Sequence, residues 1–342
     1  MIPIIFSDRL QNSTTDRTVL AGDVGGTKVN LALYKISGSK MEAVVAKQFH
    51  TAKFASFTEI LNKFFTDTGA EKPGSFCAGV AGAVVNGAAE LVNLPWGISV
   101  QEIIDATGIK KVTLINDLEA NAYGLALLKD DDLVVLHKGT SINGNAAIIA
   151  PGTGLGEAGL FWDGSFYRPF ATEGGHCDFA PRTDLDTELH TYLKQIHGIV
   201  SWEHVVSGPG IYAVYKFLRD VKKMEEPEWL KAEIKVEDPS AAISEAALQN
   251  KAPICVQTMQ LFVEHVARIC TILALKMKAT GGIFLGGGIP PKIVKLLQED
   301  IFVETFLTCD RQKDLMSLIP IQLIMNDKTA LLGAVFYGAY GD

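Results

Sequence analysis

Two glycine-rich turns are the segments of this sequence best suited to bind phosphate. Residues 22–28 read GDVGGTK and residues 151–156 read PGTGLG, and each segment lies between two predicted strands. Glycines allow the backbone to approach an anion and to point N–H groups at it. Either turn alone could be an ordinary hairpin connection, but the pair favours a clamp on one polyphosphate. The residues concerned are Gly22, Gly25, Gly26, Thr27, Gly152, Thr153 and Gly154.

Asp23 adds an acid to the first turn and a possible metal ligand. Its carboxylate could hold a hydrated Mg²⁺, while Thr27 could donate its hydroxyl to a phosphate. A third glycine cluster, formed by Gly286, Gly287 and Gly288, lies between a predicted strand and a predicted helix start. Such a turn suits close approach by a flat ligand or an anion at a helix N-terminus, or it is a simple connection.

Asn116 and Asp117 follow an apolar run that predicts a strand. Open α/β sheets place ligands at the carboxyl ends of their strands. Asp117 could therefore accept a proton from a substrate hydroxyl, and Asn116 could orient that hydroxyl. Both residue types are also good helix caps, which is the alternative role.

Glu173, His176 and Glu203 could bind hydroxyl groups. Glu173 and His176 lie in the sequence EGGH, whose glycines would expose both side chains to a ligand. Glutamate accepts hydrogen bonds and histidine can donate them, so the three suit a polyhydroxylated substrate. The alternatives are a structural histidine and a Glu203 that simply occupies the first turn of a helix capped by Ser201. The acidic run at 184–188 lacks the glycine of a calcium loop and predicts a solvated helix start.

The elements that must position these residues alternate between strand and helix. Ser56 with Glu59 and Ser99 with Glu102 are capping patterns that predict helix starts. Longer helices are expected over residues 253–279 and 328–340. Strands are expected at 18–22, 29–36, 76–80, 112–115, 146–150, 157–162, 282–285 and 319–325. This alternation predicts an α/β protein, and the repeated strand–glycine turn–strand unit indicates duplicated halves.

Composition excludes several classes of protein. The chain has 342 residues, 48% hydrophobic and 20% charged, with a net charge of −8 and no basic cluster, which argues against a nucleic-acid or anionic-membrane partner. No window offers about 18 uncharged apolar residues, so no membrane span is expected. The five cysteines form no C-x-x-C pair, which predicts reduced thiols in a cytoplasmic protein.

Taken together, the motifs resemble those of the bacterial-type glucokinases. GDVGGT from Gly22, IND ending at Asp117, GTGLG from Gly152, SGPG from Ser207 and GGGIP from Gly286 occur in that family's order. The most specific stretch is EGGHCDFAP at residues 173–181. The resemblance spans about residues 18–340.

The resemblance implies a two-domain, ribonuclease-H-like fold of the actin/hexokinase type, with a ligand cleft between the domains. Residues 1–17 are expected to be a flexible leader. Residues 18–127 plus 326–342 are expected to form a small α/β domain, and residues 128–325 a large one.

The resemblance also implies transfer of the ATP γ-phosphate to the 6-hydroxyl of glucose, with Asp117 as general base. The residues implied to hold sugar hydroxyls are Asn116, Asp117, Glu173, His176 and Glu203. Those implied to hold phosphates are Gly22, Asp23, Gly25, Gly26, Thr27, Gly152, Thr153 and Gly154, with Asp23 on Mg²⁺ through water. Gly286, Gly287 and Gly288 would lie beside the adenosine. The implied partners are glucose, ATP and a second copy of the chain, since family members are commonly homodimers.

Two departures limit the resemblance. Lys28 stands where proteobacterial members often have asparagine, and it could help to bind ATP or extend into solvent. The related repressor and kinase family has a cysteine-rich zinc motif after its histidine, whereas only Cys177 follows His176 here, so zinc is not expected.

Other functions use some of the same motifs. A kinase for another hexose or an N-acetylhexosamine would share the phosphate turns. A non-catalytic sugar-binding regulator would not need Asp117 with both turns, and an actin-like filament ATPase would not need Glu173, His176 and Glu203. The phosphoryl donor is open between ATP, ADP and polyphosphate.

Overall fold

The computed structural model describes residues 2–91, 94–140 and 142–341. The chain divides into two compact units. The first consists of Met1–Asp132, Leu160–Ala171 and Asn326–Asp342, and the second of Leu133–Gly159 and Thr172–Met325. Residues 1–17 and 160–171 thus group with the first unit, where they were not expected from the sequence.

The first unit is built on a five-stranded sheet with the order β3-β2-β1-β4-β7. Its strands are β1 (Arg17–Val24), β2 (Lys28–Ser37), β3 (Lys40–His50), β4 (Ser75–Val80) and β7 (Lys111–Asn116). β1, β2 and β3 are antiparallel neighbours, whereas β4 and β7 run parallel to β1. The predicted hairpin around the first glycine turn is therefore confirmed.

Helices α2 (Phe57–Thr68) and α3 (Val100–Thr107) begin where the capping patterns predict. The Ser56 hydroxyl accepts from the Glu59 N–H and the Ser99 hydroxyl from the Glu102 N–H. Each cap satisfies an N–H that the first turn of a helix leaves without a partner. The apolar faces of both helices pack into the core of the first unit together with residues of the sheet.

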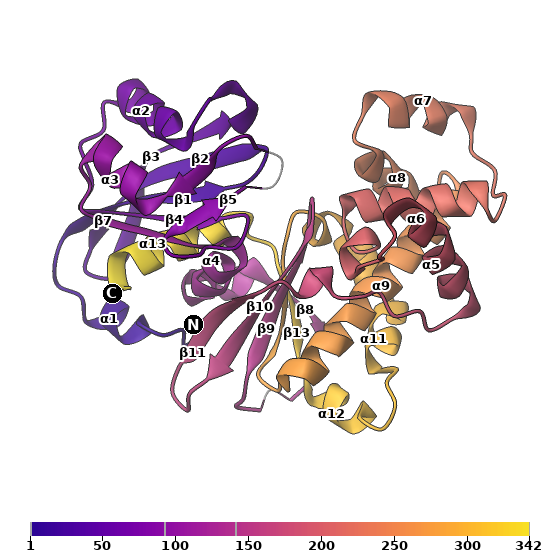
Figure 1. Cartoon of the computed structure of the whole chain (residues 1–342). Helices are drawn as coiled ribbons and strands as arrows, with labels where there is room; N and C mark the ends of the chain where they lie inside the picture. The colour runs from indigo at the N-terminus through magenta and orange to yellow at the C-terminus, as the bar shows by residue number, and fades with distance from the viewer. Residues whose placement is uncertain (1, 92–93, 141, 342) are drawn as a thin grey trace. The chain divides into compact units, whose positions relative to one another are not determined.

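The C-terminal helix α13 (Thr329–Tyr340) packs against α4 (Asp117–Gly124), β1 and β4, as Figure 1 shows in yellow within the first unit. The approach to α4 needs a glycine, because a Cβ at Gly333 would collide with the carbonyl oxygen of Ala120. The helix expected over 328–340 thus joins the far end of the chain to the element that begins with Asp117.

The N-terminal segment is ordered, contrary to the expected flexible leader. Ser7–Asn12 form α1, and Ile4 and Leu10 are buried. The Ile5 N–H donates to the Tyr167 carbonyl oxygen at 2.9 Å. The Arg9 guanidinium donates to the carbonyl oxygen of Tyr340 at 2.7 Å. Apolar burial and these two bonds hold a segment whose sequence shows no periodicity.

The second unit contains most of a six-stranded sheet with the order β11-β10-β9-β12-β13-β8. The strands are β8 (Leu133–His137), β9 (Ala146–Pro151), β10 (Leu155–Trp162), β11 (Tyr167–Thr172), β12 (Gly282–Leu285) and β13 (Ile321–Ile324). β12 lies parallel to both β9 and β13. Taken in chain order, the first five positions repeat the arrangement of the other sheet, as the duplicated sequence unit indicates.

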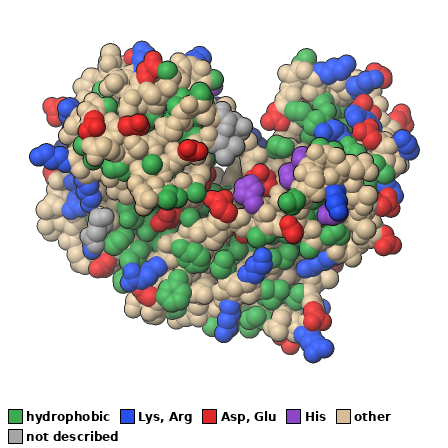
Figure 2. Space-filling view, viewed as in Figure 1, with side chains coloured by type: hydrophobic (Ala, Val, Ile, Leu, Met, Phe, Trp, Pro, Cys, Tyr) green, Lys and Arg blue, Asp and Glu red, His purple; other side chains and the backbone are tan. Residues whose placement is uncertain are grey.

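Helix α9 (Pro253–Met277) is the core of the second unit and packs against α6 (Gly208–Asp220), α8 (Pro239–Leu248) and α11 (Asp300–Leu307). It is long and apolar enough to cross a membrane by length and composition alone, but most of it is buried inside the unit. The second unit also contains α5 (Asp184–His197), α7 (Glu228–Val236), α10 (Val294–Leu297) and α12 (Lys313–Leu318). The short strands β5 (Ala88–Glu90) and β6 (Gly97–Ser99) belong to the first unit. Acidic and basic side chains are interspersed on the face in Figure 2.

Candidate active site

The first glycine turn connects β1 to β2 in the first unit and is fixed from both sides. The Gly25 N–H donates to the Lys28 carbonyl oxygen at 3.0 Å. Thr51 donates its N–H to the Thr27 carbonyl oxygen at 3.1 Å and its hydroxyl to the Gly26 carbonyl oxygen at 2.7 Å. The carbonyls are thereby engaged, and the Thr27 side chain is exposed. A turn held in this way can present N–H groups other than that of Gly25 to an anion.

Asp23 lies at the end of β1, opposite Asn30 on β2. The Asn30 amide donates to Asp23 Oδ2 at 3.0 Å. Burial raises the pKa of Asp23, and the Asn30 hydrogen bond partly opposes that rise. A carboxylate of this kind fits Mg²⁺, which is usually held by one or two carboxylates with phosphates and waters. Among the described residues, no three His, Cys, Asp or Glu side chains group to hold a metal ion by themselves.

Asn116 and Asp117 lie at the same sheet edge as Asp23. β1 and β7 flank β4 in parallel, and Gly79 of β4 is opposite both Asp23 and Ile115. Asp23 is therefore level with the residue just before Asn116. The structure brings the proposed base and the proposed metal ligand to the carboxyl ends of two parallel strands on either side of β4, where α/β sheets bind ligands.

Asn116 caps the helix that follows it, which is the alternative role that the sequence offers. Its Oδ1 accepts from the Leu118 N–H at 2.9 Å and from the Glu119 N–H at 3.3 Å, and its Nδ2 donates to the Gly82 carbonyl oxygen at 3.2 Å. The side chain is buried, 8% exposed. Asp117 is half-buried, and its Oδ1 also accepts from the Leu118 N–H at 2.9 Å. Asn116 therefore shapes the start of α4, and Asp117 sits at the positive end of that helix.

The second glycine turn, between β9 and β10, lies beside two other elements of the second unit. The Gly152 N–H donates to the Gly154 carbonyl oxygen at 2.8 Å, and the Gly208 N–H of α6 donates to the Gly152 carbonyl oxygen at 2.8 Å. The third glycine cluster approaches from the other side, because the Ile289 N–H donates to the Pro151 carbonyl oxygen at 3.3 Å. The structure thus gathers two of the predicted glycine clusters and a helix N-terminus, a combination suited to anions.

Glu203 is bound to this same turn. It lies in the 3₁₀ turn Trp202–His204, and its Oε2 accepts from the Leu155 N–H at 2.9 Å. A Cβ at Gly154 would lie 2.5 Å from that oxygen, so the glycine makes room for the carboxylate. Ser201 does begin the short helical turn, pairing with His204 rather than with Glu203.

Glu173 directly precedes the 3₁₀ turn Gly174–His176, which ends with His176, and both side chains are exposed by about 60%. His176 Nε2 is 4.0 Å from Glu173 Oε2. The chain after His176 pairs with the chain before Glu203, because the Trp202 N–H donates to the Cys177 carbonyl oxygen at 3.0 Å and the Phe179 N–H to that of Val200 at 2.8 Å. The proposed sugar ligands of the second unit therefore flank two paired segments, residues 177–179 and 200–202.

The sequence correctly predicts a helix start near residue 184, where Asp184 and Glu188 are exposed as expected, but Asp186 is buried rather than solvated. Thr183 caps α5 with Asp186, and Asp186 is only 1% exposed. It accepts from His265 and Arg268, which lie some 80 positions away in the chain. The Thr-x-x-Asp pattern signals the cap, but nothing local signals the distant partners.

Comparison with known proteins decides the family. The family model described as Glucokinase matches residues 20–340. The glucokinase of Nostoc punctiforme is 38% identical over 336 residues, covering 94% of this chain and 98% of that protein. The chain belongs to the glucokinase family.

Solved structures of glucokinases share the fold. The crystal structure of the glucokinase from an Antarctic psychrotroph matches with a TM-score of 0.79 at 31% identity, covering 94% of this chain and 98% of that one. A ROK-family glucokinase from Streptomyces griseus, crystallised with glucose and AMPPNP, matches with a TM-score of 0.64 at 18% identity, covering 95% and 100%. The expected α/β fold of the actin/hexokinase type is confirmed, and the chain is a sugar kinase of the glucokinase family.

Proposed function

We propose that this chain transfers the γ-phosphate of ATP to the 6-hydroxyl of D-glucose, with Asp117 as general base. The observation that carries the proposal is the match to the glucokinase family over residues 20–340, a range that contains the EGGHCDFAP stretch at residues 173–181. The glucokinase names of relatives at 30–38% identity support glucose as the acceptor.

Asp117 is suited to the proton transfer. It is half-buried at the carboxyl edge of the parallel strands, on the same edge as Asp23. As the bond from the sugar O6 to the γ-phosphorus forms and the bond to the ADP oxygen breaks, the hydroxyl proton passes to the Asp117 carboxylate. General-base catalysis of this type typically contributes about 10²–10⁴-fold, while positioning and charge stabilisation supply most of the rest.

The sugar hydroxyls are assigned to side chains with complementary hydrogen-bonding groups. Glu173 and Glu203 accept, His176 donates, and Asn116 offers an amide N–H beyond the one given to Gly82. Glu203 is oriented by the Leu155 N–H. A site that bonds each hydroxyl can reject analogues that lack one by up to about 10⁴–10⁵-fold.

The phosphates of ATP are assigned to the two glycine turns, and the adenosine to Gly286, Gly287 and Gly288. Asp23 would hold Mg²⁺ through water, and that ion would offset charge on the phosphates. Lys28 is exposed beside the first turn and supplies a further positive charge there.

We further propose that the expected small and large domains close when glucose binds, which would keep water from competing as phosphate acceptor. The chain would act as a cytoplasmic homodimer that feeds glycolysis. Light scattering in solution would test the dimer.

A donor-by-sugar activity matrix on the purified protein tests the proposal. The donors are ATP, ADP and polyphosphate, and the acceptors are glucose, mannose, fructose and N-acetylglucosamine. We expect ATP with glucose to give the highest kcat/KM. A higher kcat/KM with another hexose would identify that hexose, rather than glucose, as the substrate. No turnover with any pair of donor and acceptor would favour a sugar-binding regulator.

A further inference from the structure

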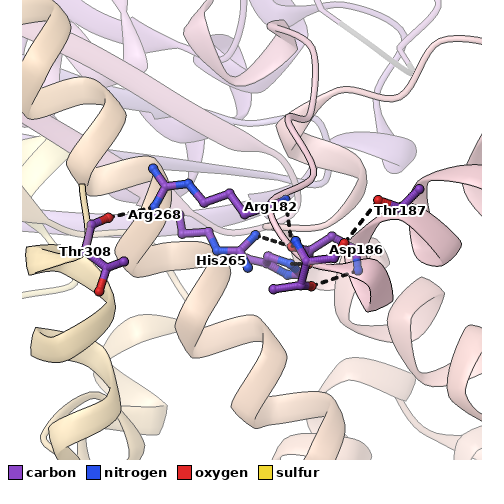
Figure 3. Close-up of polar contacts among 7 residues, drawn as sticks. Arg182, Asp186, Thr187, His265, Arg268 and Thr308 are labelled. Atoms are coloured by element: carbon purple, nitrogen blue, oxygen red, sulfur yellow. Dashed lines mark hydrogen bonds and ion pairs between the residues drawn. The ribbon is translucent and has the colours of Figure 1, made fainter. Parts of the chain in front are cut away.

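Asp186 is a buried carboxylate with a complete set of partners (Figure 3). Its Oδ1 accepts from His265 Nε2 at 3.0 Å, and its Oδ2 accepts from Arg268 at 2.6 Å. Oδ2 also accepts the N–H groups of Arg182 and Thr183 at 3.0 and 2.9 Å. Burial alone would raise the pKa of Asp186, but the hydrogen bonds from His265, Arg182 and Arg268 hold that pKa well below its usual range.

This network joins the end of the EGGHCDFAP stretch to the core helix of the second unit. Arg182 and Thr183 directly follow that stretch, while His265 and Arg268 come from the buried face of α9. His265 is 0% exposed and Arg268 is 4% exposed. A buried charge network is weak support for stability, since apolar side chains of similar volume would often serve as well. Its directed hydrogen bonds instead fix the position of the chain they hold.

His265 also supports the pairing that carries the proposed sugar ligands. Its ring packs edge-on against Phe179, with ring centroids 5.3 Å apart, and lies 6.4 Å from the ring of Trp202. Phe179 and Trp202 are themselves perpendicular at 4.9 Å. These two aromatic residues belong to the two paired segments, so one histidine contacts both.

The orientation of the His265 ring depends on few contacts. Its Nε2 must carry the proton that it donates to Asp186. Its Nδ1 is buried and has no hydrogen-bond partner within the part of the chain that the structure describes. The bond to Asp186 and the two aromatic contacts therefore set the ring.

We propose that His265, held by Asp186 and Arg268, is a positioning residue for glucose. His176 lies one residue before the paired segments and Glu203 one residue after them. The network fixes the separation of these two side chains and keeps Glu173 in place through the same turn. This inference rests on the proposed glucose site and adds residues that touch neither substrate.

Two substitutions at His265 separate its hydrogen bond from its ring. His265→Phe keeps a ring against Phe179 and Trp202 but removes the donor to Asp186. His265→Gln keeps an N–H donor but removes the ring. His137→Phe is the matched control, because His137 lies on β8, contacts Phe306 and donates its Nε2–H to the Ser317 carbonyl oxygen, away from the paired segments.

We expect His265→Phe to raise the KM for glucose by about 10- to 100-fold, since a misplacement of about 1 Å can cost as much as 10²-fold. The KM for ATP and the kcat at saturating glucose should change far less. His265→Gln should restore most of the glucose KM, and His137→Phe should match the wild type. Arg268→Lys, which keeps the charge but changes the geometry, is measured in the same way if His265→Phe does not fold.

Calorimetric titration of glucose separates failure of this inference from failure of the proposed function. If the wild type phosphorylates glucose and the variants keep its glucose KM, the positioning role is overturned while the function stands. If the wild type phosphorylates no sugar, the function fails, and weaker glucose binding by His265→Phe than by the wild type still supports the positioning role. If the wild type and His265→Phe bind glucose equally, or if neither binds glucose, the positioning role is overturned.

Discussion

Asp117 is both the proposed base and the first residue of α4. A substitution that tests the base must therefore leave the start of this helix intact. Asp117→Asn keeps an oxygen for the Leu118 N–H and removes the basic carboxylate. We expect kcat to fall by about 10²–10⁴-fold while glucose binding stays measurable, because general-base catalysis contributes about that much. Steady-state kinetics and glucose titration check both parts.

Asp117→Ala serves as the harsher variant in the same assays. It should lose as much kcat, with an added loss of stability from the missing contact at the start of α4. If either variant keeps most of the wild-type kcat, Asp117 is not the base.

The buried side chain of Glu157 on β10 predicts how the stability of the protein depends on pH. Its side chain is only 5% exposed, its Oε1 has no hydrogen-bond partner among the described residues, and its Oε2 occupies the space that a Cβ at Gly174 would need. Burial raises the pKa of this carboxyl from 4.5 to about 7, and Lys276 opposes the rise. The folded protein therefore binds this proton more tightly than the unfolded chain does.

The sign of the effect follows from that difference. Below pH 4.5 both states are protonated, and as pH rises from 4.5 to about 7 only the unfolded chain ionises, so the free energy of unfolding falls. The loss is about 3 kcal/mol and is complete above pH 7. Glu157→Gln should remove it, making the variant more stable than the wild type at pH 8 but not at pH 4. Denaturant unfolding at both pH values checks this, with the exposed Glu225→Gln as control; a wild type with no such difference contradicts the prediction.

At the scale of elements, the sequence predicts those whose signals are local. Serine caps mark α2 and α3, glycine turns mark the β1–β2 and β9–β10 connections, and the periodicity over 253–279 marks α9. It does not predict β3, because that edge strand is mostly exposed and rich in polar residues. The sequence also does not predict that α1 is ordered or that Asp186 forms its network, because both features depend on residues distant in the chain.

The third glycine cluster offers a test with a built-in control. Gly287 has a φ of +86° and a Cβ there would collide with the Pro151 carbonyl oxygen, whereas a Cβ at Gly288 would meet nothing within 4 Å. We expect Gly287→Ala to distort the turn at a cost of at least about 1 kcal/mol and to raise the KM for ATP. Gly288→Ala should fold like the wild type. Thermal unfolding and ATP kinetics check both variants. If the two variants have the same stability and the same KM for ATP, the turn is not needed for ATP binding in the way proposed.

At the scale of the whole molecule, the candidate residues are divided between the two units. Asp23, Asn116 and Asp117 belong to the first, and Glu173, His176 and Glu203 to the second. Residue types and local motifs identify these groups in the sequence. Their grouping within each unit follows from sheet register and from the pairing of residues 177–179 with 200–202, which no single segment encodes.

That division leads to the prediction that glucose changes the spacing of the units. Glucose bound as we propose would contact residues of both units, so its binding energy would favour a closed arrangement. We expect the radius of gyration from X-ray scattering to fall when D-glucose is added, and not when L-glucose is added. The double variant Glu173→Gln/His176→Ala, which alters only the second unit's exposed ligands, should not respond to D-glucose. A wild-type radius unchanged at saturating D-glucose, with binding shown by calorimetry, would mean that the sugar binds without closure.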